Sequence, residues 1–259
     1  MSKMLRKVLV CFAVTLTLTV TVAASTETNW KGIYFGGNLG GALGRSTANT
    51  STVFSPTGYF ATTSVPAIAS TGRQSLRPNG VTAGGQIGTN FQIGSLVFGG
   101  EADFGSIRLK ESASGTTVYP CCSPTNFTVT QSIKTDWLFT ARARGGYAVG
   151  NALVYLTGGL GTTQLNYQAV FTDTFATAAE SGGVDKRKNG WMAGGGIEYR
   201  LVSHFSVKGE YLYADFGRVT TTTTGLTAFT PSIAYPSNGW THTAALHKNI
   251  FRSGVNYRW

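Results

Sequence analysis

Charged residues are scarce in this sequence, making up 12% of its 259 residues, about half the usual share. Cysteine and histidine occur only three times each, and the histidines lack the spacing of a metal site. After residue 24 there is no run of about 20 apolar residues, which excludes a helical membrane span there. Aromatic residues also reach 12%, so the low charge does not indicate disorder.

The N-terminus has the pattern of a secretory signal peptide. Basic residues precede an apolar run over residues 8–22, and two alanines follow it as a small-residue cleavage site. We expect residues 1–24 to be removed, which leaves residues 25–259 as one exported domain.

Eight later segments alternate apolar and polar residues with a period of two, which is typical of half-buried strands. They are residues 30–44, 80–92, 96–108, 135–149, 152–165, 190–201, 205–217 and 250–259. The connections between them are alternately long and short, as in barrels whose two ends face different compartments. The sequence therefore predicts an all-β fold, an eight-stranded antiparallel up-and-down transmembrane β-barrel with four long extracellular loops and short periplasmic turns.

Alternation alone does not decide which face of the barrel meets water, because soluble lipocalin-like barrels alternate too. Here the charged face carries few charges and many glycines, unlike a soluble exterior. Aromatic residues gather near the strand ends, as interfacial girdles require: Trp30, Phe91, Trp137, Tyr147, Trp191, Tyr199, Phe205 and Trp259. We therefore predict that the apolar face meets lipid and that the protein lies in the outer membrane.

The charged side chains of the strands then point into a lumen that is only wide enough to be filled by side chains. Buried charges must be paired, since leaving one unpaired is costly. Folding the hairpins about their turns predicts three pairs, Glu101 with Arg142, Glu198 with Lys208 and Glu210 with Arg252, and Asp103 and Arg144 join the first. This predicts a plugged interior; a narrow porin-like channel is the alternative.

Basic residues mark the outer end of every predicted strand except the fifth. They are Arg45, Arg77, Arg108, Lys134, Lys188, Arg218 and Lys248. A cationic collar at this height would bind lipopolysaccharide phosphates through charge-assisted hydrogen bonds. The alternative is that loops simply begin with polar residues. Either explanation accounts for the basic balance without nucleic acid, which we do not expect as a partner.

Few residues offer site chemistry, and no catalytic set, cofactor or metal is predicted. His247 beside a serine or threonine could serve a lipid hydrolase, but ordinary polar placement is the favoured interpretation. The histidines with Tyr119 or Tyr235 form a second alternative, haemin binding. Cys121 and Cys122 are adjacent in an exported loop, where they can bridge each other or cross-link to another molecule.

Three stretches carry a family resemblance: Trp-Lys-Gly-Ile-Tyr-Phe-Gly-Gly-Asn-Leu-Gly at residues 30–40, Leu-x-Tyr-x-Thr-Gly-Gly-Leu-Gly at 153–161, and Gly-Val-Asn-Tyr-Arg at 254–258. They resemble the small alphaproteobacterial outer-membrane β-barrel proteins of the outer membrane immunogenic or RopB type, also called the porin family, with an OmpA-like barrel. The resemblance implies surface-exposed structural proteins and antigens, some credited with haemin binding. The terminal tryptophan, where phenylalanine is usual, and the adjacent cysteines depart from the family pattern.

The last strand also predicts a contact with the barrel-assembly machinery. Phe251, Val255, Tyr257 and Trp259 share its apolar face and form the expected assembly signal. Together these patterns predict a non-enzymatic, monomeric envelope protein in contact with lipid and lipopolysaccharide, whose loop partners the sequence does not name.

Overall fold

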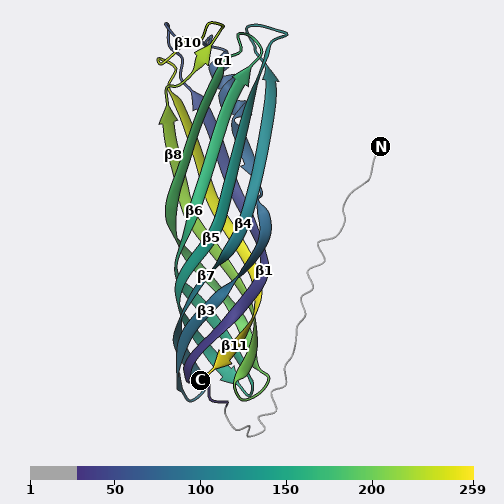
Figure 1. The fold of residues 1–259 in the computed structure, drawn as a ribbon, viewed down its shortest axis with the longest axis vertical. Helices are drawn as coiled ribbons and strands as arrows, with labels where there is room; N and C mark the ends of the chain where they lie inside the picture. Colours follow the sequence, from purple (N-terminus) through teal and green to yellow (C-terminus); the bar gives the residue numbers. More distant parts are fainter. Residues whose placement is uncertain (1–27) are drawn as a thin grey trace, which may run out of the picture.

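The structure is a computed structural model that describes residues 28–259, so the predicted signal peptide, 1–24, lies outside the described residues. Long strands wind around a tall cylinder, and one helix and three short strands lie at its outer end (Figure 1). The elements are β1 (Gly32–Thr52), α1 (Ser64–Thr71), β2 (Arg73–Leu76), β3 (Asn79–Ile93), β4 (Leu96–Val118), β5 (Asn126–Val149), β6 (Ala152–Asp173), β7 (Ala179–Arg200), β8 (Phe205–Thr223), β9 (Thr227–Ala228), β10 (Ile233–Ala234) and β11 (Trp240–Arg258).

The sheet closes on itself. Each long strand pairs antiparallel with the next along the chain, and β11 pairs with both β8 and β1. The ring therefore runs through β1, β3, β4, β5, β6, β7, β8 and β11, and the pairing of β7 with β8 completes it. This confirms the predicted all-β ring of antiparallel up-and-down strands. Closure removes the free edges that an open sheet would expose.

Tight turns join the strands at the end where the C-terminus lies (Figure 1). Gly94 and Gly150 occupy two of these turns with φ of 57° and 54°, a left-handed conformation that glycine adopts without a steric cost. At the opposite end the connections are residues 53–78, with α1 and β2, and residues 224–239, with β9 and β10.

The other two outer connections are much shorter than predicted. β4 continues to Val118 and β5 begins at Asn126, while β6 continues to Asp173 and β7 begins at Ala179. The prediction of long loops here was wrong, because polar segments were interpreted as loops, and the one between β4 and β5 is also rich in serine and threonine. Threonine is a good strand former, and the alternation of buried and more exposed residues continues through these extensions.

The two faces of the sheet differ as predicted for a membrane barrel. Large apolar residues point outward, with Leu156 75% and Leu160 68% exposed, while polar residues such as Gln86 are buried inside. No helix among residues 28–259 is long and apolar enough to cross a membrane.

Candidate functional site

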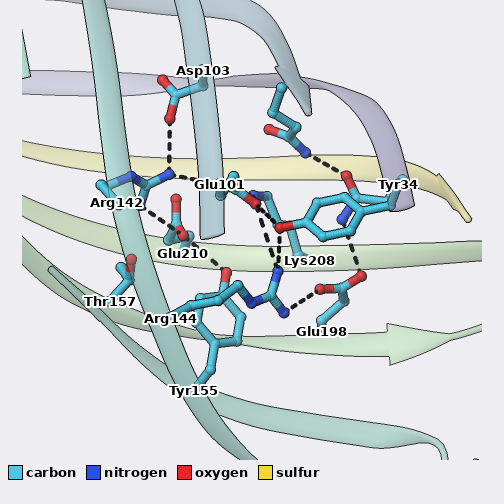
Figure 2. Close-up of polar contacts among 12 residues, drawn as sticks. Tyr34, Glu101, Asp103, Arg142, Arg144, Tyr155, Thr157, Glu198, Lys208 and Glu210 are labelled. Carbon is cyan, nitrogen blue, oxygen red and sulfur yellow. Dashed lines mark hydrogen bonds and ion pairs between the residues drawn. The ribbon is translucent and has the colours of Figure 1, made fainter. Parts of the chain in front are cut away.

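The strongest concentration of charge lies inside the barrel, centred on Arg142 of β5 (Figure 2). Its Nη2 lies 2.6 Å from Glu101 Oε1 and 2.8 Å from Asp103 Oδ2, and its Nη1 lies 3.1 Å from Glu210 Oε1. Glu101 stands opposite Arg142 in the β4–β5 register, whereas Glu210 reaches it from β8. Arg142 therefore ties strands from different sides of the ring together.

A second guanidinium, that of Arg252 on β11, binds two of the same carboxylates. Its Nη2 lies 2.6 Å from Glu210 Oε2 and 3.0 Å from Asp103 Oδ2. Arg252 and Glu210 are also register partners in the β8–β11 hairpin, as the sequence pattern places them. Asp103 and Glu210 are thus each shared between two arginines.

The predicted pair of Glu198 with Lys208 was wrong. The two residues are opposite each other in the β7–β8 register, but Lys208 Nζ reaches across the lumen and lies 2.8 Å from both oxygens of Glu101. Glu198 instead accepts from Arg144 Nη2 at 2.7 Å and from Arg258 Nη2 at 3.3 Å. In so narrow a barrel, a long side chain reaches the opposite wall as easily as its own hairpin partner.

Two tyrosines complete the network, and we did not predict them as site residues. Tyr34 donates to Glu101 Oε2 at 2.8 Å and accepts from Arg144 Nη1 at 2.9 Å (Figure 2). Tyr155 donates to Glu210 Oε1 at 3.0 Å, and the Arg144 guanidinium lies 4.2 Å from its ring centroid. The inward position of Tyr34 in the strand alternation is the signal that could have identified it.

Glycines make room for these tyrosine rings. A Cβ added at Gly88 would overlap the ring of Tyr34, and one at Gly196 would contact the ring of Tyr155. At these two positions glycine relieves crowding in the lumen, where a larger side chain would displace a ring.

Towards the periplasmic end, Trp30 lies beside two arginines. It is fully buried, so its predicted place in the exposed aromatic girdle was wrong. The guanidinium groups of Arg200 and Arg258 lie 5.0 Å and 5.1 Å from its ring centroid, and Arg258 also donates to the Trp30 carbonyl. Cation–π contacts of this kind hold an aromatic ring beside buried charge.

Above the ion pairs the lumen becomes an apolar core, and Lys248 lies within it. This lysine is 0% exposed, so its predicted place in the outer collar was wrong. Lys248 and Arg252 are an even number of residues apart on β11, so their side chains point to the same face of the sheet, the lumen. Its Nζ lies 3.2 Å from Thr135 Oγ1, 3.4 Å from Thr163 Oγ1 and 4.9 Å from the Phe216 ring centroid. The surrounding apolar residues include Ile107, Leu109, Ile133, Leu138, Leu165, Leu212, Leu246 and Ile250.

Five of the other six predicted collar residues are exposed on the outer surface. The sixth, Lys188, is half-buried and faces the lumen side of β7, because it stands opposite the fully buried Thr163 in the β6–β7 register. Lys134 pairs with Asp136 at 3.0 Å, and half-buried Lys188 donates to the Arg218 carbonyl at 3.1 Å. Exposed collar residues are Arg45, Arg77, Arg108, Lys134 and Arg218, and the exposed cations Arg73, Lys110, Lys186 and Arg187 were missed. Lys134 lies three residues closer to the outer end of β5 than Trp137 does. Lys188 lies three residues closer to the outer end of β7 than Trp191 does.

At the outer end, aromatic side chains from three of the connections and from the outer ends of β5, β6 and β11 pack together. This aromatic cap comprises Phe60, Tyr119, Phe127, Phe171 and Trp240, with Ile68 of α1 and the partly buried Tyr59 and Tyr235. Cys121 and Cys122 form a disulfide with each other at its edge.

The hydroxyl groups of Tyr59 and Tyr119 both donate to Asp173 Oδ2, at 2.5 Å and 2.9 Å. Burial, and then the Asp173 carboxylate, raise the pKa of both tyrosines above the ordinary value. A tyrosine must lose its proton to bind ferric iron well, so these contacts disfavour Tyr119 as a haemin ligand.

The histidines are separated from one another. His204 lies in a turn at the C-terminal end, and His247 Nδ1 lies 3.4 Å from Asp215 Oδ1. His242 is fully buried between Thr50 Oγ1, at 3.0 Å, and Glu180 Oε2, at 3.3 Å. The sequence pattern had predicted that Glu180 lies in a loop between two strands. Among residues 28–259, no three His, Cys, Asp or Glu side chains are grouped to hold a metal ion.

The apolar face of β11 points away from the lumen. Phe251, Val255 and Trp259 are exposed, Trp259 by 86%, and Tyr257 is half-buried. Tyr257 stands opposite Phe35 of β1, with ring centroids 5.5 Å apart. The four predicted assembly residues therefore lie beside the seam that closes the ring.

Known proteins share this sequence pattern. Residues 12–258 match the family described as outer membrane protein beta-barrel domain. The 31 kDa outer-membrane immunogenic protein of Brucella melitensis is 34% identical over 145 residues, which cover 53% of this chain and 57% of that protein. The 25 kDa outer-membrane immunogenic protein of the same organism is 27% identical over 232 residues, covering 90% of this chain and 80% of that protein.

Solved barrels are more distant. The outer membrane protease OmpT of Escherichia coli has a TM-score of 0.41 at 11% identity, covering 89% of this chain and 98% of that one. Neisserial surface protein A has a TM-score of 0.31 at 12% identity, covering 86% and 99%. Both scores are low, and the family assignment rests on the sequence matches. The chain thus belongs to the outer-membrane β-barrel family, as a relative of the alphaproteobacterial outer-membrane immunogenic proteins, and its location is the outer membrane.

Proposed function

We propose that this protein is a non-enzymatic structural and surface-exposed component of the outer membrane whose lumen does not conduct. The observation that supports this most is the network around Arg142 and Arg252. Together they hold Glu101, Asp103 and Glu210, and the side chains of all five residues are at most 5% exposed. Contacts that cross an eight-stranded barrel in this way occupy the space that solute would need.

Two further layers support a closed lumen. Trp30 and Arg258 lie on the periplasmic side of the ion pairs, and the apolar core around Lys248 lies on the outer side. A solute would have to break buried charge pairs and then enter an apolar region, each at a cost of several kcal/mol.

Single-channel recording in planar bilayers tests this proposal with the full mature chain. We expect rare, small openings at most, measured beside a general porin as the conducting control in the same bilayers. Steady openings of uniform size would overturn the proposal and favour a narrow porin-like channel instead.

The absence of enzymatic activity has its own structural support. Thr50, His242 and Glu180 have the residue types of a nucleophile, base and acid, but all three are buried inside the outer part of the barrel. A general base must come within hydrogen-bond reach of its substrate, and a fully buried imidazole offers no such approach. We infer that this group joins the β1, β7 and β11 strands and has no catalytic role.

We propose further that the outer collar binds lipopolysaccharide phosphates. In this proposal the collar consists of Arg45, Arg77, Arg108, Lys134 and Arg218, without the buried Lys248 and without Lys188, which faces the lumen side of β7. Aromatic residues such as Trp137 and Trp191 occupy membrane interfaces. A cation three residues farther along a strand lies up to about 10 Å beyond that level, where lipid phosphates are found.

The collar is tested by replacing Arg45, Arg77, Arg108 and Arg218 with glutamine and measuring co-purified lipopolysaccharide phosphate. We expect the amount bound to fall by more than half, and the residual binding to decrease with added salt. The matched control replaces Lys31 and Arg200, cations at the other end of the barrel, and should leave the amount unchanged. Unchanged binding in the collar variant would contradict the proposal.

A further inference from the structure

A small pocket lies in the aromatic cap, at the outer end of the barrel. Its volume is about 200 Å³. The walls are aromatic rings and a disulfide, contributed by Tyr59, Phe60, Tyr119, Phe175 and the Cys121–Cys122 bridge, with Ala61 and Ser64. Phe60 and Tyr119 are buried, whereas Phe175 is 54% exposed and Cys121 is exposed, so the pocket is bounded by both the core of the cap and its surface.

The polar groups beside this pocket are already bound to one another. Tyr59 and Tyr119 both donate to Asp173 Oδ2. The other oxygen of Asp173 accepts the backbone N–H groups of Ala176, at 3.3 Å, and Ala178, at 2.8 Å. These contacts fix the tyrosine rings in place and leave the carboxylate little capacity to bind ligand hydroxyl groups. A sugar, which needs several such partners, is therefore a poor occupant.

The remaining chemistry of the walls suits an aromatic ring. Tyr59 already packs against Phe60, Phe175 and Tyr235, with ring centroids 5.1 Å, 6.3 Å and 5.4 Å apart. Aromatic rings prefer such offset and edge-to-face neighbours, and the polarizable sulfur atoms of the disulfide also make favourable contacts with ring edges.

The size of the pocket narrows the ligand class. An apolar cavity of about 150 Å³ accommodates a benzene ring, while drug-sized ligands occupy pockets of roughly 300 Å³ or more. A pocket of about 200 Å³ therefore takes one ring or two fused rings and is too small to enclose a porphyrin. None of the side chains that line it carries a formal charge, so an uncharged ligand is favoured.

We propose that this pocket is a binding site for small uncharged aromatic compounds of one or two rings, such as indole. The site lies outside the membrane, is covalently held by the Cys121–Cys122 bridge, and is independent of whether the lumen conducts. It adds a ligand-binding activity to the structural role proposed above.

The test titrates 5-fluoroindole into the full mature chain in lipid nanodiscs and follows the fluorine NMR signal, with empty nanodiscs subtracted. We expect saturable binding, competition by indole and none by glucose. Absence of saturable binding above the empty nanodiscs would overturn the proposal, as would competition by glucose equal to that by indole.

Two variants form a matched pair for the same titration. Phe175 lines the pocket and Phe229 does not, yet both rings lie 6.3 Å from the Tyr59 ring centroid and both are substantially exposed. Phe175→Ala should weaken binding by about fivefold, the size of one aromatic contact, and Phe229→Ala should leave it unchanged. Equal losses in both variants would refute the assignment of the pocket, and so would unchanged binding in Phe175→Ala.

The disulfide provides a separate variant for this titration. Replacing Cys121 and Cys122 together with serine removes the sulfur wall without changing the side-chain volumes greatly. We expect weaker binding of 5-fluoroindole with an unchanged heat-modifiable gel mobility, which reports an intact barrel. Unchanged affinity of this variant for 5-fluoroindole would refute the role of the disulfide in the binding site.

Discussion

Replacing Arg142 with alanine removes three ion pairs from the lumen in one step. The lost contacts, at 2.6, 2.8 and 3.1 Å, leave Glu101, Asp103 and Glu210 with fewer partners. Removing one member of a buried charge network costs about 3–5 kcal/mol. We expect the lower end, about 3 kcal/mol, because Lys208 still binds Glu101 and Arg252 still binds the other two carboxylates.

A double-mutant cycle separates this electrostatic loss from the loss of packing. Glu101→Ala leaves Arg142 with two carboxylates, and the double variant removes both members of the shortest of its three contacts. The two losses should therefore not add, with a coupling of about 2 kcal/mol. The free energy of unfolding is measured by guanidinium titration in phospholipid bilayers, followed by tryptophan fluorescence and gel mobility.

The surface pair of Lys134 and Asp136 is the control for that cycle. Its atoms are also close, 3.0 Å apart, but both side chains are 53% exposed. Water and salt screen such a pair, so its coupling should be about 0–1 kcal/mol. Additive losses for Glu101 and Arg142, or a coupling no larger than that of the surface pair, would refute the ion-paired description of the lumen.

Three other outcomes follow from single contacts. Lys248→Met should raise the free energy of unfolding, because this buried charge contacts neutral hydroxyls and a ring, whereas Lys208→Met should lower it; a loss in both variants would contradict this. Because burial raises the pKa of Tyr59 and Tyr119, their contribution to stability is complete below the unfolded tyrosine pKa of about 10 and is lost as pH rises beyond it. Tyrosinate absorbance should show Tyr59 and Tyr119 losing their protons at a higher pH than an ordinary tyrosine. Titration of both residues near the ordinary tyrosine pKa would refute this prediction. Trp259→Phe should change unfolding by no more than about 0.5 kcal/mol, since Trp259 is so exposed, so any change in insertion measured by pulse-labelled assembly would be kinetic.

Much of the fold was predictable because a strand has a period of two. Alternation separates lipid-facing residues such as Leu160 from lumen residues such as Gln86, and the same parity places Arg252 inside. The same alternation explains the error at Lys248. This residue was assigned to the outer collar because it lies near a strand end, although its side chain points to the same face as that of Arg252. Strand length was harder to predict, because the serine- and threonine-rich extensions of β4 and β5 have the composition of loops.

The sequence by itself determined the antiparallel sheet, its two faces and most of the charges that enter the lumen, since each of these depends on local periodicity; Lys248 and Glu180 are the exceptions. Only the tertiary structure decided which charges meet, because partners in a narrow barrel are chosen across the lumen. Lys208 bypasses its hairpin neighbour Glu198 to reach Glu101 for this reason. The aromatic cap is likewise tertiary: Tyr59 and Tyr119 lie in two separate connections and Asp173 ends β6, and only the closed ring brings them together.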